Sequence, residues 1–558
     1  MTAAAPAARP ARARPAARRG TGLAGVGELA RLALRRDRVM LPAWVYVLAG
    51  SQAEVAFSLR GLYPTAARRH DLAATVAGNP ALAFLYGPLH GSSPGALTAW
   101  RYLAYSALGA GLMTIFLVIR HTRADEQAGR LELAGSAAVG RAAALTAALA
   151  VAGLASAVTA VLMVIIAVVL ALPLGGAIAY ALAVAGSGLV FAALAAVTAQ
   201  VSANPRGARG LAIAVLGAGF VLRGAGDAAS AGAGAAGGGL GWLSWLSPAG
   251  WAEQVRPFAG DRWAVLLLPA AAAVLLAAAA YGLAGRRDLG AGLWPDRPGR
   301  PAAGAVLRGP AGLAWRLQRG NLAGWAFGLL ATGVAVGAAA QGIGSLLGTS
   351  SSLRQAFERI GGQGALVSAY LAAIMSLAGV AAAGYAVSAA LRLQSEESAR
   401  LAEVVLVTPT GRVRWAASHL AVVAAGTAVV LAAAGLGAGL GYGLRAGDAG
   451  TQVPRLLEAG LVQLPAALVV AGVAVALFGL APGWAVPGGW TALALAALAA
   501  LLGPALRLPS WLAGLSPFGH VPRLPGAAVS AGPLAALSVV ALALAAAGLA
   551  GLHRRDLR

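Results

Sequence analysis

The feature that most constrains this chain is a series of apolar runs, each about as long as a helix that crosses a lipid bilayer. A membrane-spanning helix needs roughly 20 mostly apolar residues. The runs lie at about residues 39–59, 100–119, 142–172, 174–201, 210–226, 263–283, 322–341, 367–391, 415–444, 458–481, 484–506 and 529–552. We therefore expect an all-α polytopic membrane protein with about 12 transmembrane helices.

The small share of charged residues supports this conclusion. Of 558 residues, 59% are hydrophobic and 11% are charged, whereas about a quarter of a soluble protein is charged. The net charge is +23, and the chain has no lysine, so its basic residues are arginines. They gather at the ends of the apolar runs, which is the positive-inside pattern. This placement indicates the lipid bilayer, and not nucleic acid, as the partner of these side chains.

Both chain ends are basic. Residues 1–21 are mostly Ala, Pro and Arg with no acidic residue, and the chain ends in the basic run 553–558. A signal peptide would have an apolar core close behind its charges, but the first apolar run begins only near Val39. We expect a disordered cytoplasmic tail over 1–21, with a transit peptide as the alternative. The prediction is a multi-pass protein of the cell membrane with both termini in the cytoplasm.

The chain reads as two related halves of six apolar runs, residues 22–285 and 309–558, joined by a polar linker at 286–308 that is rich in Pro and Arg. Three sequence matches occur in the same order and at similar offsets. They are Trp44 with Trp325, Glu126 with Glu397, and Pro248 with Pro517. Because six is an even number, both copies would have the same orientation, as in a parallel repeat.

Each half carries one charged segment between two apolar runs, the first at residues 120–141 and the second at 392–413. We interpret both as short amphipathic helices at the cytoplasmic face, although a solvated loop would explain either one alone. In each segment an acid precedes an arginine by four residues, which would place the pair on one helix face. The candidate residues are Arg123, Asp125, Glu126, Arg130 and Glu132, followed by Glu396, Glu397, Arg400 and Glu403.

An arginine-rich amphipathic stretch precedes the first apolar run of each half, at 23–38 and at 309–321. Leucines alternate with arginines there, which is typical of a helix that lies in the membrane interface. The candidate residues of these interfacial helices are Arg35, Arg38, Arg316 and Arg319.

The sequence contains no sign of an ATP-hydrolysing or other catalytic site. A Walker A loop needs a lysine, and this chain has none. The glycine-rich run 435–443 has Gly-x-x-x-Gly spacing inside an apolar run, which indicates close helix packing. There are no cysteines, and the six histidines are scattered, so no metal site or cofactor is expected. We predict that the chain is not an enzyme.

Polar residues near the apolar runs are candidates for a substrate path. Arg223 and Asp227 are four residues apart and fit a structural ion pair better than substrate ligands. Glu54 fits a side chain that reaches the outer interface. The candidate path residues, each of which could equally be a core or lipid-facing residue, are Gln52, Glu54, Tyr102, Tyr105, Met113, Gln341, Tyr370, Met375 and Tyr385.

In its charged segments and interfacial helices the chain resembles the ABC-2-type permeases of actinobacterial antibiotic exporters, the family of polyketide-antibiotic and tetronasin-transport permeases. The shared features are the two interfacial helices, the sequences at 123–132 and 396–403, Thr408-Pro409, and a Ser-Pro motif before the last helix of each half. The chain departs from the family pattern at Arg400-Leu401, where Gly-Arg would be expected, and at Ala137-Ala138, which replaces Thr-Pro.

The resemblance implies the permease subunit of an ATP-driven exporter of hydrophobic drugs or antibiotics. A separate ABC ATPase, in two copies, would bind ATP and Mg²⁺ and seat the charged segments as coupling helices. Alternating access would follow from rocking of the two halves. Two alternatives stay open: an ion-coupled secondary multidrug transporter, which needs buried titratable groups, and a membrane enzyme acting on lipid-linked substrates, which needs external acidic clusters.

Overall fold

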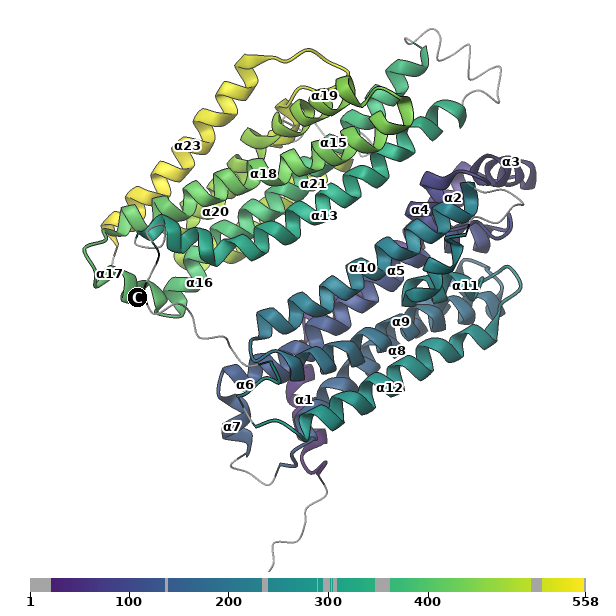
Figure 1. Ribbon diagram of the computed structural model, residues 1–558, viewed down its shortest axis with the longest axis horizontal. Helices are drawn as coiled ribbons and strands as arrows, with labels where there is room; N and C mark the ends of the chain where they lie inside the picture. The colour runs from purple at the N-terminus through teal and green to yellow at the C-terminus, as the bar shows by residue number, and fades with distance from the viewer. Residues whose placement is uncertain are drawn as a thin grey trace, which may run out of the picture. The chain divides into compact units, whose positions relative to one another are not determined.

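The computed structural model describes residues 22–135, 139–232, 239–288, 290–294, 302, 304, 309–346, 362–502 and 514–555. The predicted tail at 1–21 lies outside them. The chain divides into two compact units, Met1–Pro298 and Gly299–Arg558, and each is a bundle of helices (Figure 1). Within the described residues there is no β-strand, and the single β-bridge joins Ser202 to Trp294.

The helices of the first unit follow the predicted order. They are α1 (Val26–Arg36), α2 (Met40–Leu62), α3 (Ala66–Val76), α4 (Pro80–Tyr86), α5 (Pro94–Ile119), the π-helical turn η1 (Arg120–Ala124), α6 (Asp125–Gln127), α7 (Arg130–Gly135), α8 (Ala143–Val169), α9 (Leu174–Val201), α10 (Pro205–Gly232), η3 (Gly241–Leu246), α11 (Pro248–Gln254), η4 (Trp263–Leu266) and α12 (Leu267–Ala284).

The described residues of the second unit form a comparable series of helices. It contains α13 (Pro310–Leu346), α15 (Gly362–Ala390), α16 (Arg392–Ser398), α17 (Leu401–Leu406), α18 (Arg412–Ala446), α19 (Ala449–Leu461), α20 (Leu464–Leu480), η6 (Pro482–Trp484), α21 (Ala485–Leu502), η7 (Pro517–His520) and α23 (Ala531–Arg554).

Eleven helices of the described part are long and apolar enough to cross a membrane, and they coincide with eleven of the twelve predicted runs. This confirms the all-α polytopic class. The remaining predicted run, residues 39–59, forms α2, whose 23 residues suffice in length. It is not among those eleven, and the polar residues Gln52 and Glu54 lie near its middle.

The six long helices of each unit pack in the same pairs. In the first unit α9 contacts α5, α8, α10 and α12, and in the second unit α19 and α20 together contact α15, α18, α21 and α23 in the corresponding places. The fourth long helix is therefore the centre of each bundle. The recurrence of this pairing supports the predicted duplication independently of the sequence matches.

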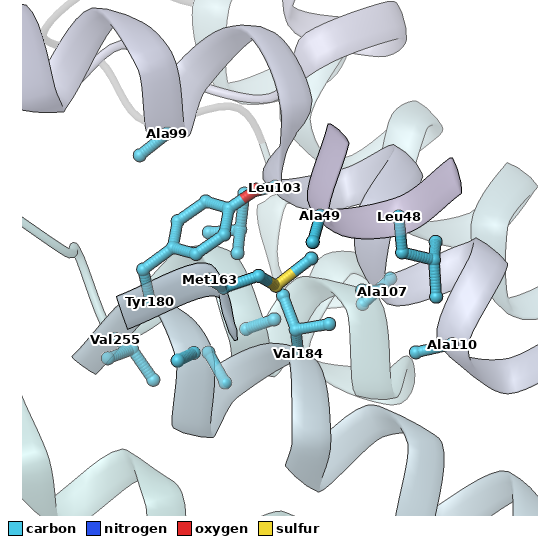
Figure 2. Close-up of a cluster of buried hydrophobic side chains, with 14 of the residues drawn as sticks. Leu48, Ala49, Ala99, Leu103, Ala107, Ala110, Met163, Tyr180, Val184 and Val255 are labelled. Carbon is cyan, nitrogen blue, oxygen red and sulfur yellow. The ribbon is translucent and has the colours of Figure 1, made fainter. Parts of the chain in front are cut away.

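Small residues and buried hydroxyl groups bring α5 and α9 close together. The Tyr180 hydroxyl lies 3.0 Å from Ser106 Oγ, and Thr114 donates a hydrogen bond of 2.9 Å to the Gly188 carbonyl. The same cluster of buried side chains includes Leu48, Leu103, Met163 and Val184, which come from four helices (Figure 2). Packing of this kind suits a membrane protein, where helices associate through close contact and interhelical hydrogen bonds.

The glycine run of α18 packs against two neighbouring helices at once. Cβ atoms added at Gly435, Gly439 or Gly443 would meet the backbone of α19, and Cβ atoms at Gly437 or Gly441 would meet the backbone of α13. On the opposing helix, Gly333 and Gly337 show the same spacing and face α18. The predicted close packing of the 435–443 run is confirmed, and it involves a matching Gly-x-x-x-Gly on α13.

The two interfacial helices differ between the halves. The first is the separate helix α1, whereas the second is the beginning of the continuous helix α13. Pro42 stands in the first turn of α2, where a missing N–H is tolerated, and Ala323 stands at the matching position in α13. A proline would break the backbone hydrogen bonds of a continuous helix, so the first half starts a new helix while the second continues.

Candidate functional site

The first charged segment continues the helix α5 beyond its apolar part. The chain passes from α5 through the π-helical turn η1 into α6, and the helix then stops at Gly129, which has a φ of 69°. A π-helical turn is rare and is frequently found at functional sites. It places His121, Arg123 and Glu126 in the interior of the first half, where each is less than 10% exposed.

Glu126 is the most densely bonded residue of this segment. Both oxygens of its carboxylate accept hydrogen bonds from Arg287, at 2.6 and 2.9 Å, and the backbone N–H of Gly290 donates a third. Arg123 forms an ion pair with it at 2.9 Å. Because Arg287 follows α12, this bidentate ion pair ties the end of the second long apolar helix to the end of the last helix of the same half.

The second half contains the same ion pair in the corresponding place. Arg555, directly after α23, donates two hydrogen bonds of 2.6 Å to the two carboxylate oxygens of Glu397. Its guanidinium group also lies over the Phe478 ring, 4.9 Å from the ring centre. We call Glu126–Arg287 and Glu397–Arg555 the two arginine clamps.

The two clamp arginines were not predicted, although the sequence carries a signal for them. Both are the second arginine of the sequence Arg-Arg-Asp-Leu, which occurs at 286–289 and again at 554–557, after the last helix of each half. Part of the segment predicted as a linker, residues 286–288 and 290–294, packs on the first half. The N–H of Trp294 donates to the carbonyl of Val201 there.

A buried histidine lies near each clamp. In each half it pairs with the acidic residue that comes directly before the clamp glutamate in the sequence. In the first half, His121 lies 2.5 Å from Asp37 and 3.9 Å from Asp125. In the second half, His419 lies 3.3 Å from Gln318 and 3.5 Å from Glu396. The offset of Trp44 and Trp325 aligns Asp37 with Gln318. In both halves a histidine therefore connects the interfacial stretch with the charged segment.

The predicted acid–arginine pairs at a spacing of four residues are wrong. Arg130 bonds to Asp125 at 2.8 Å, and Arg392 bonds to Glu396 at 2.9 Å. The helix is interrupted between the predicted partners in both segments, because Gly129 and Arg400 adopt left-handed backbone conformations. The helical spacing on which the prediction depended is absent at these positions.

Arg400 occupies the position of Gly129, and this explains its departure from the family pattern. Its φ of 56° is costly for a residue with a Cβ atom. Replacing Arg400 by glycine should therefore stabilise the second half by about 1 kcal/mol, measured as a rise in the Tm of the purified chain. Gly129→Ala is the matched reverse change and should lower the Tm. A lower Tm for Arg400→Gly would show that its side chain stabilises the turn.

The candidate residues of the charged segments separate into a buried and an exposed set. Arg123, Asp125, Glu126, Glu396 and Glu397 are buried, whereas Arg130, Glu132, Arg400 and Glu403 are exposed. Large apolar side chains accompany the exposed set: Leu133 is 76% exposed, Val404 72% and Val407 88%. The buried acids hold each turn in place, and the exposed residues form its free face.

The interfacial candidates Arg35, Arg38, Arg316 and Arg319 are all exposed. The residues between the first two make the contacts with the charged segment, since Arg36 forms an ion pair with Asp125 at 2.7 Å and Arg120 with Asp37 at 3.1 Å. In the first half, ion pairs therefore connect the interfacial stretch to the charged segment, and they involve residues next to the predicted arginines.

Most of the candidate path residues lie within the packing of their own half. Gln52, Met113, Met375 and Tyr385 are buried, and Tyr102 and Tyr370 donate hydrogen bonds to the carbonyls of Leu48 and Val336. Tyr105 packs between Tyr86 and Phe220, and Glu54 is exposed. The side chain of Gln341 lies outside the described residues. Their role in a substrate path stays a prediction.

Comparison with known proteins places this chain beside a drug-export protein. The family model described as multidrug efflux system permease Rv1217c, C-terminal domain, matches residues 307–553. The multidrug efflux system permease protein Rv1217c of Mycobacterium tuberculosis is 44% identical over 552 residues, which cover 98% of each chain. The match therefore includes both halves.

Proposed function

The chain belongs to the family of the multidrug efflux permease Rv1217c, and from this premise we propose that it is the membrane subunit of an ATP-driven ABC exporter of hydrophobic drugs. The resemblance to drug-export permeases is confirmed by that membership, and a transporter role fits the family better than an enzymatic one. The energy source, the partner and the orientation in the cell membrane belong to the proposal.

The two arginine clamps are the observation that carries the proposal. Each one joins a charged segment to the last helix of the same half through a buried bidentate ion pair. A force applied to the exposed face of the segment would therefore move the second and sixth long helices together. A subunit that converts an external motion into helix movement needs such a rigid connection.

The external motion would come from a separate ABC ATPase, in two copies, one at each charged segment. The ATPase would bind ATP and Mg²⁺, and this chain would supply the path for a hydrophobic molecule through the membrane. The exposed residues of the segments combine large apolar side chains with charged ones, a mixture that also occurs at protein contact surfaces. With both segments in the cytoplasm, the chain termini would also be cytoplasmic.

Substitution of the exposed apolar residues tests this proposal without disturbing the clamps. The permease is co-expressed with a candidate partner ABC ATPase, and the complex is isolated through a tag on the permease. We expect Leu133→Asp combined with Val404→Asp to lose the ATPase and the efflux of a hydrophobic fluorescent dye. The permease itself should keep its Tm, because both side chains are more than 70% exposed.

The matched control is Leu62→Asp. Leu62 is also a leucine, is 61% exposed, and is the last residue of α2, away from the charged segment. This variant should leave the complex intact. Retention of the ATPase by the double variant would refute the contact. Dye efflux that an uncoupler abolishes at constant ATP would refute the ATP-driven mechanism and favour the ion-coupled alternative.

A further inference from the structure

Three charged side chains are buried together at the end of the first half that lies opposite its charged segment (Figure 1). Arg223 and Asp227 belong to α10, and Glu253 belongs to α11. Their exposed fractions are 0%, 4% and 6%. The sequence predicted the first two as a structural ion pair. Glu253, the third member, lies in a short helix outside the apolar runs.

Arg223 connects three elements of the fold through this cluster. Its Nη1 atom lies 2.6 Å from Glu253 and 3.4 Å from Asp227. Its Nη2 atom donates a hydrogen bond of 2.7 Å to the Phe84 carbonyl in α4. The contacts of one guanidinium group therefore hold α4, α10 and α11 against one another.

One oxygen of the cluster is left without a partner. Glu253 Oε2 is buried and has no hydrogen-bond partner in the described part of the chain. Glu253 lines a cavity of about 20 Å³ together with Tyr86, His90, Trp100 and Arg256. That volume is enough for a single water molecule, so the oxygen can exchange a proton with the solvent through this cavity.

The charges of the cluster do not balance if both acids are ionised. Two carboxylates against one guanidinium group leave one negative charge in a site that water barely reaches, and a buried unpaired charge is strongly destabilising. Burial raises the pKa of Glu253 well above its ordinary value, and the charge of Asp227 raises it further, although Arg223 opposes the shift.

The other charged groups around the cavity do not supply the missing positive charge. Burial, aided by Arg256 and Arg262, lowers the pKa of His90 to about 4, so its ring is neutral at pH 7. Arg256 lines the cavity but forms no ion pair with Glu253 among the described residues. The tyrosines near the cluster, Tyr86 and Tyr105, cannot supply it either, because a phenol group carries no positive charge.

We propose that Asp227 and Glu253 together bind one exchangeable proton at neutral pH and that this proton keeps α4, α10 and α11 closed on one another. On release, the O–H bond of the carboxyl group breaks and the proton passes to water in the cavity. The two acids then share the single positive charge of Arg223, and the contact between the helices weakens. The two groups titrate as a pair, so the proton belongs to both.

Infrared spectroscopy of the full-length chain in lipid nanodiscs tests the proton directly, since a protonated carboxyl group has a carbonyl band that a carboxylate lacks. We expect this band at pH 7 in the unmodified chain and its loss in both Glu253→Gln and Asp227→Asn. Each variant leaves one carboxylate paired with Arg223, so neither needs a proton. The control Asp71→Asn, an exposed acid of α3, should leave the band unchanged.

The pH dependence of stability is the second measurement. A raised pKa in the folded state gives stability that is present at low pH and is lost as the pH rises through that value. The Tm of the unmodified chain should therefore fall between about pH 5 and about pH 9, and Glu253→Gln should lose the part of this fall that Asp71→Asn retains. An absent band at pH 7, or an identical pH profile in Glu253→Gln, would overturn the proposal.

Discussion

Replacing Gly337 by leucine is expected to prevent the second half from folding, whereas the same replacement at Gly328 leaves it folded. Both glycines belong to α13. A Cβ atom at Gly337 would lie closer than 3.0 Å to the backbone of Ala438 in α18, and a Cβ atom at Gly328 would meet nothing within 4 Å. The backbone of a packed helix cannot move aside as a side chain can, so the cost should exceed the roughly 1–3 kcal/mol typical of overpacking.

The measurement is the yield of monodisperse chain from detergent extracts, together with its Tm. Gly337→Ala should fall between Gly337→Leu and the unmodified chain, since one methyl group already overlaps the Ala438 backbone. If Gly337→Leu and Gly328→Leu were extracted with equal yield and Tm, the close contact of α13 with α18 would be disproved.

Removing an arginine clamp is expected to have the largest effect on transport. Breaking a buried ion pair by deleting one partner costs about 3–5 kcal/mol, because the remaining charge stays buried. Glu126→Ala should be more damaging than Arg287→Ala, since Glu126 pairs with both Arg287 and Arg123. Dye efflux should be abolished in both variants, and the Tm should fall in the same order.

The neighbouring arginine provides the control for each clamp. Arg286 and Arg554 precede the clamp arginines and are exposed, so their replacement by alanine should leave Tm and efflux unchanged. In the second half, the double variant Glu397→Gln with Arg555→Gln should be less damaged than Arg555→Ala, because it removes both charges of that clamp together. Normal efflux by Arg287→Ala and Arg555→Ala would show that the clamps are dispensable for transport.

The long helices could be predicted from the sequence because the position and length of each one follow from its own run of apolar residues. The run predicted at 142–172, for example, forms α8 from Ala143 to Val169. The charged segments were recognised for the same local reason, as dense groups of charge between two apolar runs. The repeat of six helices could also be read from the sequence, because its matches keep their order.

The bonds of the site could not be predicted, because they join residues that are distant in the sequence. The spacing of four residues indicated a partner for Glu126 within its own helix, but a backbone turn at Gly129 removed that partner. The actual partner, Arg287, is supplied by packing of α12 beside α9. Spacing along one helix contains no information on such a contact, and only the repeated Arg-Arg-Asp-Leu sequence could have suggested it.

The position of the clamp arginines determines when the clamp of each half can form during synthesis of the chain. Arg287 and Arg555 are among the last residues of their halves, so an emerging half can form its clamp only when its sixth helix is complete. Every clamp bond stays within one half. Each half therefore contains a complete clamp, and a chain of one half alone would keep the connection between its charged segment and its sixth helix.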